Sequence, residues 1–125
     1  MRIDNIFNYT NIMGVAMQGN VVRQNAISNN IANVDTPGFK RSRVDFEDSL
    51  AVAVNNFNAT GRLDLSFVQP RISTEFDHLR YRWDENNVDI ELEMVQLYQT
   101  GMRFNVISSG IMNHYRIVNM VIAMV

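Results

Sequence analysis

The C-terminal third of the sequence has the most regular hydrophobic pattern in the chain. Positions spaced alternately by four and three residues run from residue 90 to residue 125 without a proline. This heptad spacing predicts one long helix with a coiled-coil seam, roughly 50 Å in length. Nine of the eleven seam positions are apolar or aromatic, and the full set is Ile90, Met94, Leu97, Gly101, Phe104, Ser108, Ile111, Tyr115, Val118, Ile122 and Val125.

The start of this predicted helix is acidic. Asp89, Glu91 and Glu93 fall in its first turns, where negative charge complements the helix dipole. Either Asn87 or Asp89 suits the N-cap position, because its side-chain oxygen can accept a hydrogen bond from a free N–H group. We interpret the carboxylates as helix-start residues and not as a calcium loop, since they lack the glycine and the ligand order of an EF-hand.

A second helix is predicted near the N-terminus, and it ends before Asp35-Thr36-Pro37-Gly38. The residue before a proline is biased away from helix, and Pro-Gly suits the centre of a type II turn. The apolar positions of this segment recur at roughly helical spacing. They are Ile6, Met13, Met17, Val21, Ile27 and Ile31.

The middle of the chain has no sustained pattern. Residues 44–50 predict a short helical turn with Phe46 and Leu50 on one face. Residues 61–70 alternate apolar and polar positions through Leu63, Leu65 and Phe67, which predicts a short strand or an extended arm. Residues 78–83 show no period. We therefore divide one domain into residues 1–38, residues 39–86 and residues 87–125.

The C-terminal helix is also apolar away from its seam. A helix that is apolar over most of its circumference is buried on most sides. A membrane span does not fit, because polar and charged residues interrupt every window of about 18 residues. We therefore predict burial among other protein helices. The apolar positions off the seam are Val95, Tyr98, Met102, Val106, Met112 and Met120.

Composition and charge argue against several functional classes. The net charge of -2 gives no basic surface for nucleic acid or anionic lipid. The chain has no cysteine, which excludes disulfides and thiolate metal sites. Its two histidines, His78 and His114, stand in no catalytic pattern, and no glycine-rich phosphate loop is present. We predict no catalytic residue, no metal and no cofactor, and therefore no enzyme.

The segment from Ser28 to Arg41 resembles the N-terminal signature of the flagellar rod and hook family. In that signature a helix ends in an Asn-Asn-Ile-Ala-Asn run and continues into a Thr-Pro-Gly-Phe-Lys turn. The lead Asn86-Asn87-Val88-Asp89 and the short middle segment resemble the proximal rod branch. The residues matching the signature are Asn29, Asn30, Ile31, Ala32, Asn33, Thr36, Pro37, Gly38, Phe39 and Lys40.

This resemblance implies a mainly α fold in which the long N- and C-terminal helices pair as an antiparallel coiled coil around a short irregular or β middle segment. It implies a structural subunit of the flagellar basal body that polymerises into the proximal rod and transmits motor torque. We expect assembly contacts from Asn29, Asn30, Ile31, Asn33, Thr36, Pro37, Gly38 and Phe39 of the signature, and from Met94, Leu97, Phe104, Ile111, Tyr115, Val118 and Ile122 of the seam.

The partners implied are other copies of the chain, other rod proteins, the adaptor at the membrane-ring base and the flagellar type III export apparatus. Neither nucleic acid nor direct insertion into a membrane is expected. No cleavable secretory signal is visible at the start of the sequence, so we expect export to the periplasmic rod without one. The alternatives are a helical export chaperone or adaptor of the same secretion route, and another type of rod subunit.

Overall fold

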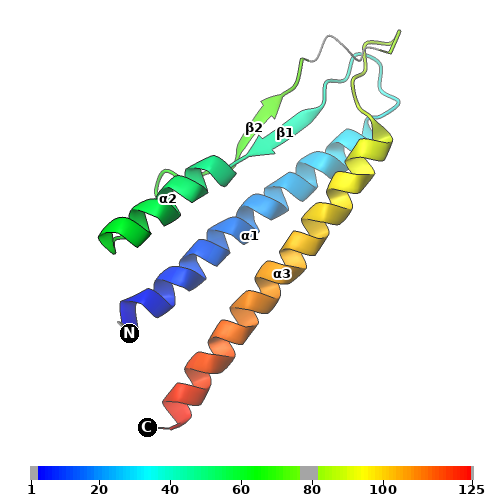
Figure 1. The fold of residues 1–125 in the computed structure, drawn as a ribbon. Coiled ribbons are helices and arrows are strands. Elements are labelled where there is room, and N and C mark those ends of the chain that lie inside the picture. The colour runs from blue at the N-terminus through cyan, green and yellow to red at the C-terminus, as the bar shows by residue number, and fades with distance from the viewer. Residues whose placement is uncertain (1–2, 77–81, 125) are drawn as a thin grey trace.

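A computed structural model describes residues 3–76 and 82–124 of the chain, with side chains from residue 7 onward. Two long helices, α1 (Ile3–Ala32) and α3 (Ile90–Ala123), lie side by side and run in opposite directions, so that the two ends of the chain are at the same end of the molecule (Figure 1). The predicted mainly α fold with paired terminal helices is confirmed. Ile6 as a packing residue, His78 and Val125 lie outside what is described.

The boundaries of the long helices follow the expected chemistry. Asp89 caps α3, and its carboxylate accepts hydrogen bonds from the N–H groups of Glu91 and Leu92 at 3.0 and 3.2 Å. At the same end of the pair, after α1, Gly38 has φ of 72° and the Phe39 N–H donates to the Thr36 carbonyl at 3.2 Å. A positive φ at this position is the requirement of the predicted type II turn, which glycine meets without strain.

The middle segment is more ordered than its sequence pattern indicates. Strands β1 (Ser42–Asp45) and β2 (Arg71–Thr74) pair antiparallel, with Ser42 opposite Thr74 and Asp45 opposite Arg71. Helix α2 (Glu47–Thr60) follows β1 and packs against α1 (Figure 1). Gly61 ends α2 in the left-handed conformation, with φ of 71°.

Two predictions for this segment were right only in part, for the helical turn and for the strand alternative at residues 61–70. The helical turn expected at residues 44–50 is instead the end of a strand followed by a helix of 14 residues, which buries Ala53 and Phe57. Residues 61–70 form no strand. The strand that pairs with β1 is β2, which begins only at Arg71. The apolar alternation there lacks a partner strand, and Phe67 is 45% exposed.

The apolar core is small for a chain of this length. Phe46 lies against Gly19 of α1, where an added side chain would overlap its ring, and the Arg23 guanidinium lies 5.2 Å from the ring centre. The molecule exposes 8711 Å², about 1,900 Å² more than the roughly 6,800 Å² of a compact 14.4 kDa monomer. The buried apolar residues are Ile27, Val44, Phe46, Ala53, Phe57, Val68 and Val88.

Candidate assembly site

The end of α1, the β hairpin and the start of α3 are joined by polar side chains, buried or half-buried, which we call the junction cluster: Asn30, Asn33, Arg41, Asn86, Asn87 and Glu93. Asn86 has no exposed surface. Its amide donates to the carbonyls of Asn33, Val34 and Thr36 at 2.9, 3.0 and 2.8 Å. Asn86, which precedes α3, thus ties the start of α3 to the turn that follows α1.

Asn30 and Asn87 attach the hairpin to this junction. The side chain of Asn30 accepts from the Ser42 N–H at 2.9 Å and donates to the Ser42 carbonyl at 2.8 Å. Asn87 accepts from the Arg41 N–H at 2.6 Å and donates to the Glu75 carbonyl at 2.8 Å. Each amide thus both accepts from and donates to the backbone of the hairpin, which an asparagine side chain can do because it carries an acceptor and two donors.

The centre of the cluster is a buried ion pair between Arg41 and Glu93. Arg41 is 8% exposed and Glu93 is fully buried. Arg41 donates from Nε to Glu93, from Nη1 to Glu75 at 2.6 Å and from Nη2 to Gln96 at 2.9 Å. Burial lowers the pKa of Arg41, but its hydrogen bonds to Glu93 and Glu75 outweigh that effect, so the pKa lies above its ordinary value.

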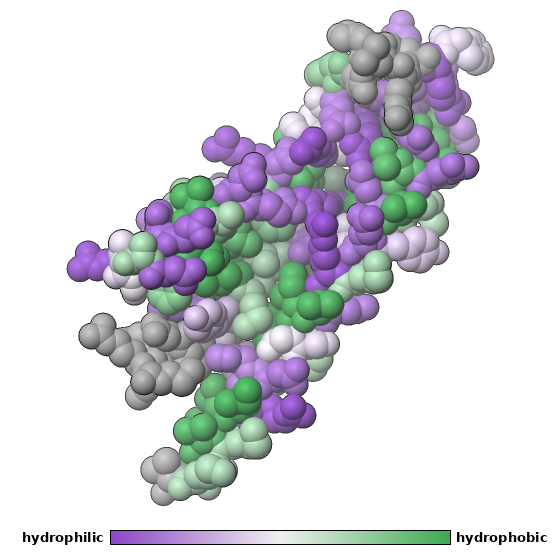
Figure 2. Space-filling view, in the orientation of Figure 1, coloured by the Kyte–Doolittle hydropathy of each residue, from purple (hydrophilic) through white to green (hydrophobic). Residues whose placement is uncertain are grey.

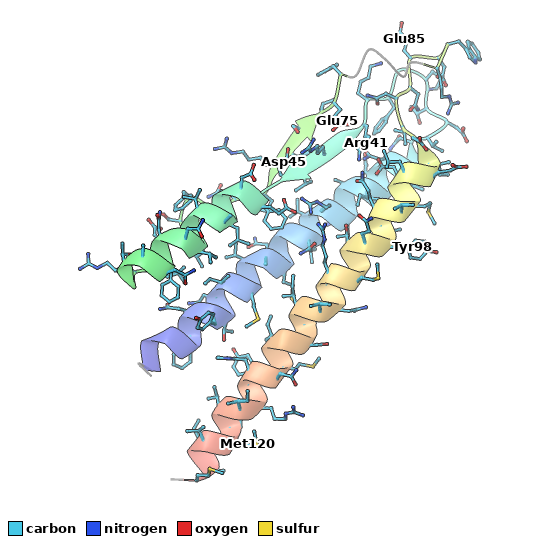
Figure 3. All side chains as sticks on the ribbon, viewed as in Figure 1. Arg41, Asp45, Glu75, Glu85, Tyr98 and Met120 are labelled. Atoms are coloured by element: carbon cyan, nitrogen blue, oxygen red, sulfur yellow. The ribbon has the colours of Figure 1, made fainter. Side chains whose placement is uncertain are left out.

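Sequence reasoning missed this ion pair. Glu93 was assigned to helix-dipole complementation in the first turns of α3, yet its carboxylate also accepts from Asn30 at 3.1 Å inside the molecule. The sequence does contain a signal for it. Glu93, Leu97, Thr100 and Phe104 form a row with the same four-and-three spacing as the predicted seam. This row shares Leu97 and Phe104 with the seam but has Glu93 and Thr100 where the seam has Met94 and Gly101. Figure 3 shows Arg41 and Glu75 between the hairpin and the two long helices.

The side of α3 that the rest of the chain covers therefore differs from the predicted seam. The covered row consists of Glu93, Leu97, Thr100, Phe104, Ile107, Ile111, His114 and Val118, and the small seam residues Gly101 and Ser108 beside it are also half-buried. The predicted seam shares Leu97, Phe104, Ile111 and Val118 with this row. Its other large members are more exposed, with Ile90 at 45%, Met94 at 37%, Tyr115 at 50% and Ile122 at 66%.

The signature residues divide in a similar way. Asn30 is buried, and the amide of Asn33 donates to the Asn29 carbonyl at 2.8 Å, so both act within the chain. At the surface lie Asn29, Thr36, Pro37 and Gly38, while Ile31 and Phe39 are half-buried. The contacts of these residues with a partner stay a prediction, and any effect of Asn30 on assembly is through the shape of the junction.

The side of α3 that faces away from α1 forms an uncharged row, which we call the outward stripe. Figure 3 shows Tyr98 pointing away from α1, and Figure 2 shows hydrophobic residues recurring along the half of the molecule that contains the chain ends. No described helix is long and apolar enough to cross a membrane. The stripe, exposed throughout, consists of Val95, Tyr98, Met102, Val106, Ser109, Asn113, Ile117, Met120 and Met124.

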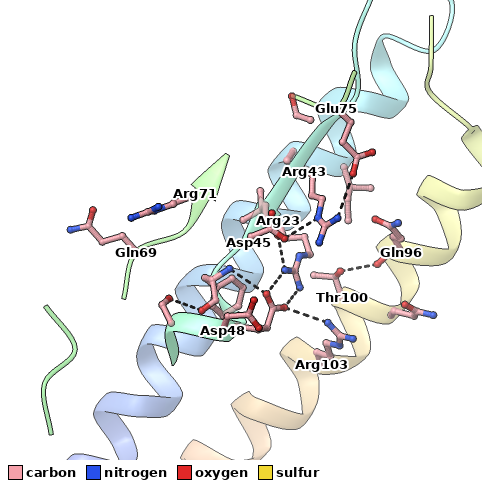
Figure 4. Close-up of a pocket in the computed structure, with 18 of the residues that line it drawn as sticks. Arg23, Arg43, Asp45, Asp48, Gln69, Arg71, Glu75, Gln96, Thr100 and Arg103 are labelled. Carbon is pink, nitrogen blue, oxygen red and sulfur yellow. Dashed lines mark hydrogen bonds and ion pairs between the residues drawn. The ribbon is translucent and has the colours of Figure 1, made fainter. Parts of the chain in front are cut away.

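A charged pocket of about 760 Å³ lies between β1, the start of α2 and α3 (Figure 4). Arg23 donates to Glu47 at 2.7 Å, and Arg103 lies 3.7 Å from the same carboxylate. Burial raises the pKa of the Glu47 carboxyl, but the hydrogen bonds from Arg23 and from the backbone outweigh burial and hold that pKa below its ordinary value. The Glu47 carboxylate is thus closely paired with Arg23, which favours a structural use of this pocket.

Comparison with known proteins places these features in a family. Residues 13–40, from α1 through the Thr-Pro-Gly turn, match the family described as "Flagella basal body rod protein". The chain is 37% identical over 115 residues to the "Flagellar basal body rod protein FlgB" of Borrelia hermsii, covering 81% of this chain and 85% of the relative. It is 31% identical to the FlgB of Borreliella burgdorferi, again covering 81% of this chain and 85% of the relative.

A more distant FlgB, from Bacillus subtilis, is 31% identical over 88 residues, which are 66% of this chain and 68% of that protein. The flagellar hook protein FlgE of Treponema pallidum is 51% identical over only 35 residues, or 28% of this chain and 8% of the hook protein. Similarity to hook proteins is thus local, whereas similarity to FlgB extends over most of both chains. The chain therefore belongs to the flagellar basal body rod proteins, and it is a structural rod subunit most like FlgB.

Proposed function

We propose that this rod subunit assembles through the outward stripe of α3, while the junction cluster fixes the angle between the helical pair and the hairpin. The observation that supports this most directly is the stripe itself. Over about 30 residues of α3 it has no charged side chain, and no described part of the chain covers it. Uncharged apolar surface of this extent is uncommon on a monomer and marks an interaction site.

The exposed area supports the same proposal. The excess of about 1,900 Å² over a compact monomer is similar to the area that a stable protein–protein interface buries. Assembly would therefore bring the exposed area toward that of a compact protein. In this proposal the subunit has no catalytic role, binds copies of itself and other rod subunits, and passes torque along the packed helices.

Its route and neighbours are part of the proposal. We infer that the chain reaches the rod in the periplasm through the flagellar export apparatus, without a cleavable signal, and that its neighbour at the base is the membrane-ring adaptor. The similarity to rod proteins along most of the chain supports this inference and leaves the export-chaperone alternative without support. A test is periplasmic recovery of the tagged chain in strains with and without a functional export gate.

Complementation of a strain that lacks the subunit tests the use of the stripe. Met120→Asp places a charge on the stripe at a side chain that is already 50% exposed, so the fold of the chain is retained. We expect loss of swimming and of rods in isolated basal bodies, at unchanged levels of the protein. Asn119→Asp, an exposed neighbour on α3 that lies off the stripe, is the matched control and should swim. Normal swimming of Met120→Asp would refute the role of the stripe.

A further inference from the structure

The turn that leads into α3 presents a single tryptophan to solvent. Trp83 is 97% exposed, more than any other large apolar side chain among the described residues. We call residues 82–86 the tip turn. Figure 3 shows Glu85, two residues after Trp83, at the end of the molecule far from both chain ends. A fully exposed tryptophan on a monomer is unusual, because this residue is highly buried on average.

The backbone of the tip turn is firmly held. The Gly38 N–H donates to the Asp84 carbonyl at 2.8 Å, and the Glu85 N–H donates to the Arg82 carbonyl at 2.8 Å. The Arg82 guanidinium donates to the Val34 carbonyl at 3.0 Å and pairs with Asp84 at 3.1 Å. Trp83 is therefore presented by a preorganised turn, which lowers the entropy lost when such a side chain becomes an interface anchor.

A groove suited to an apolar side chain lies elsewhere on the molecule. It has a volume of about 620 Å³, with α1 as its floor and α2 and α3 as its walls. Ala16, Leu50 and Ile107 contribute to its apolar surface, together with Met102 and Val106, which the groove shares with the outward stripe. Asn20 also lines it, and Oδ1 of Asn20 is a buried side-chain acceptor with no partner among the described residues. We call this the α2–α3 groove.

The chemistry of the two features is complementary. An indole ring is apolar over most of its surface and carries one hydrogen-bond donor, and the groove offers it apolar walls. The exposed carboxylate of Glu85 accompanies Trp83, and Arg103 lines the groove with 57% of its side chain exposed. Its contact with Glu47 is a long 3.7 Å, which leaves it available to a second carboxylate.

The two features cannot meet within one chain. Ala16 and Asn20 lie 16 and 12 residues before the end of α1 at Ala32, which places the groove about 18–24 Å along the helix from the junction. The tip turn is hydrogen-bonded at that junction. The occupant of the groove must then come from another molecule, and a second copy of the chain supplies a suitable one.

We propose that the tip turn of one copy docks in the α2–α3 groove of a second copy, with Trp83 as its anchor. This inference rests on the proposed assembly function and adds a second contact to the outward stripe. Because different surfaces of the two copies meet, the contact is heterologous and generates an open-ended series. It predicts neighbouring copies staggered along the helix axis by about 20 Å.

Trp83 is the only tryptophan of the chain, so its fluorescence reports on the contact directly. The experiment follows emission and sedimentation of the full chain as its concentration rises. We expect the emission to shift to shorter wavelength in step with association, because the indole leaves water. Trp83→Ala should weaken association at least tenfold, the usual minimum for an anchoring tryptophan, with circular dichroism unchanged.

Variants of the groove complete the test. Leu50→Asp should abolish the shift while Trp83 is present, whereas Val52→Asp should retain it, because Val52 is on the same helix, 52% exposed and outside the groove. Should Leu50→Asp perturb the fold, disulfide formation between mixed Trp83→Cys and Leu50→Cys chains gives a second measurement, since the chain has no cysteine of its own. We expect more cross-linking than between Trp83→Cys and Val52→Cys chains.

Three outcomes would overturn the inference: no association up to the solubility limit, association without a change in emission, or equal cross-linking to both positions on α2. Its failure is separable from failure of the proposed function. If Met120→Asp abolishes swimming while Trp83→Ala swims normally, the assembly role stands and the docking of the tip turn does not.

Discussion

Replacement of Glu93 by alanine removes one partner of the buried ion pair in the junction cluster. In the intact chain the Glu93 carboxylate accepts from both Arg41 and Asn30. The alanine variant leaves the Arg41 guanidinium, 8% exposed, with a free Nε–H donor and a cavity beside it. The Asn30 amide keeps its bond to the Ser42 carbonyl, so the main loss falls on Arg41.

The expected cost follows from the burial of both groups. Removing one member of a buried ion pair destabilises by about 3–5 kcal/mol, because the other charge is left without compensation. Here Glu75 still pairs with Arg41 at 2.6 Å and is itself partly exposed. We therefore expect a loss near the lower end, about 3 kcal/mol. With a urea dependence of about 1–3 kcal/mol per molar, the unfolding midpoint should fall by about 1–3 M.

Urea unfolding of the isolated chain, followed by circular dichroism, measures this change. Asp45→Ala is the matched control, since it breaks the 2.9 Å pair between Arg43 and Asp45, whose side chains are 58% and 53% exposed. Exposed pairs of this kind contribute about 0–1 kcal/mol. If Glu93→Ala and Asp45→Ala destabilise equally, by less than about 1 kcal/mol, the central role of the buried pair is refuted.

Three further changes probe the fold in the same assay. Asn86→Ala removes three hydrogen bonds to carbonyls after α1 and the partner of the buried Val88 N–H, and it should cost about 2–4 kcal/mol; a cost below about 0.5 kcal/mol would contradict the role of Asn86 at the junction. Gly19→Ala places a methyl group against the Phe46 ring and should cost about 1–3 kcal/mol, whereas Gly14→Ala, which meets nothing within 4 Å, should be neutral or stabilising. The pKa of Glu47 is lowered by folding, so its small contribution is present above the ordinary value of 4.5 and disappears as the pH falls through the folded-state pKa. The free energies of unfolding of the intact chain and of Glu47→Gln should therefore differ at neutral pH and converge in acid. A difference that grows in acid would contradict a lowered pKa of Glu47.

Much of the fold was accessible from the sequence because its signals are local. The long apolar periodicity of residues 90–125, the Pro37–Gly38 turn and the acidic start of α3 each act within a few residues. The structure confirms the two helices, the turn and the cap by Asp89. The family signature was also readable, since it is a contiguous run of residues.

What could not be predicted depends on contacts between distant residues. The two rows that share Leu97 and Phe104 differ at the positions of Met94 and Glu93, and hydrophobicity alone favours the row with Met94. Glu93 is hydrogen-bonded to Arg41 and Asn30, which lie more than 50 residues away in sequence. These two partners stabilise the charged side chain in the interior. In the same way β1 selects residues 71–74 as its partner, which the alternation at residues 61–70 could not indicate.

Electron cryomicroscopy of basal bodies that contain this subunit tests the central claim most directly. The account predicts density for α1 and α3 in the proximal rod, with the outward stripe from Val95 to Met124 covered by helices of neighbouring subunits. A chain found in the rod with this side of α3 facing solvent, or a chain absent from the rod, would contradict the account.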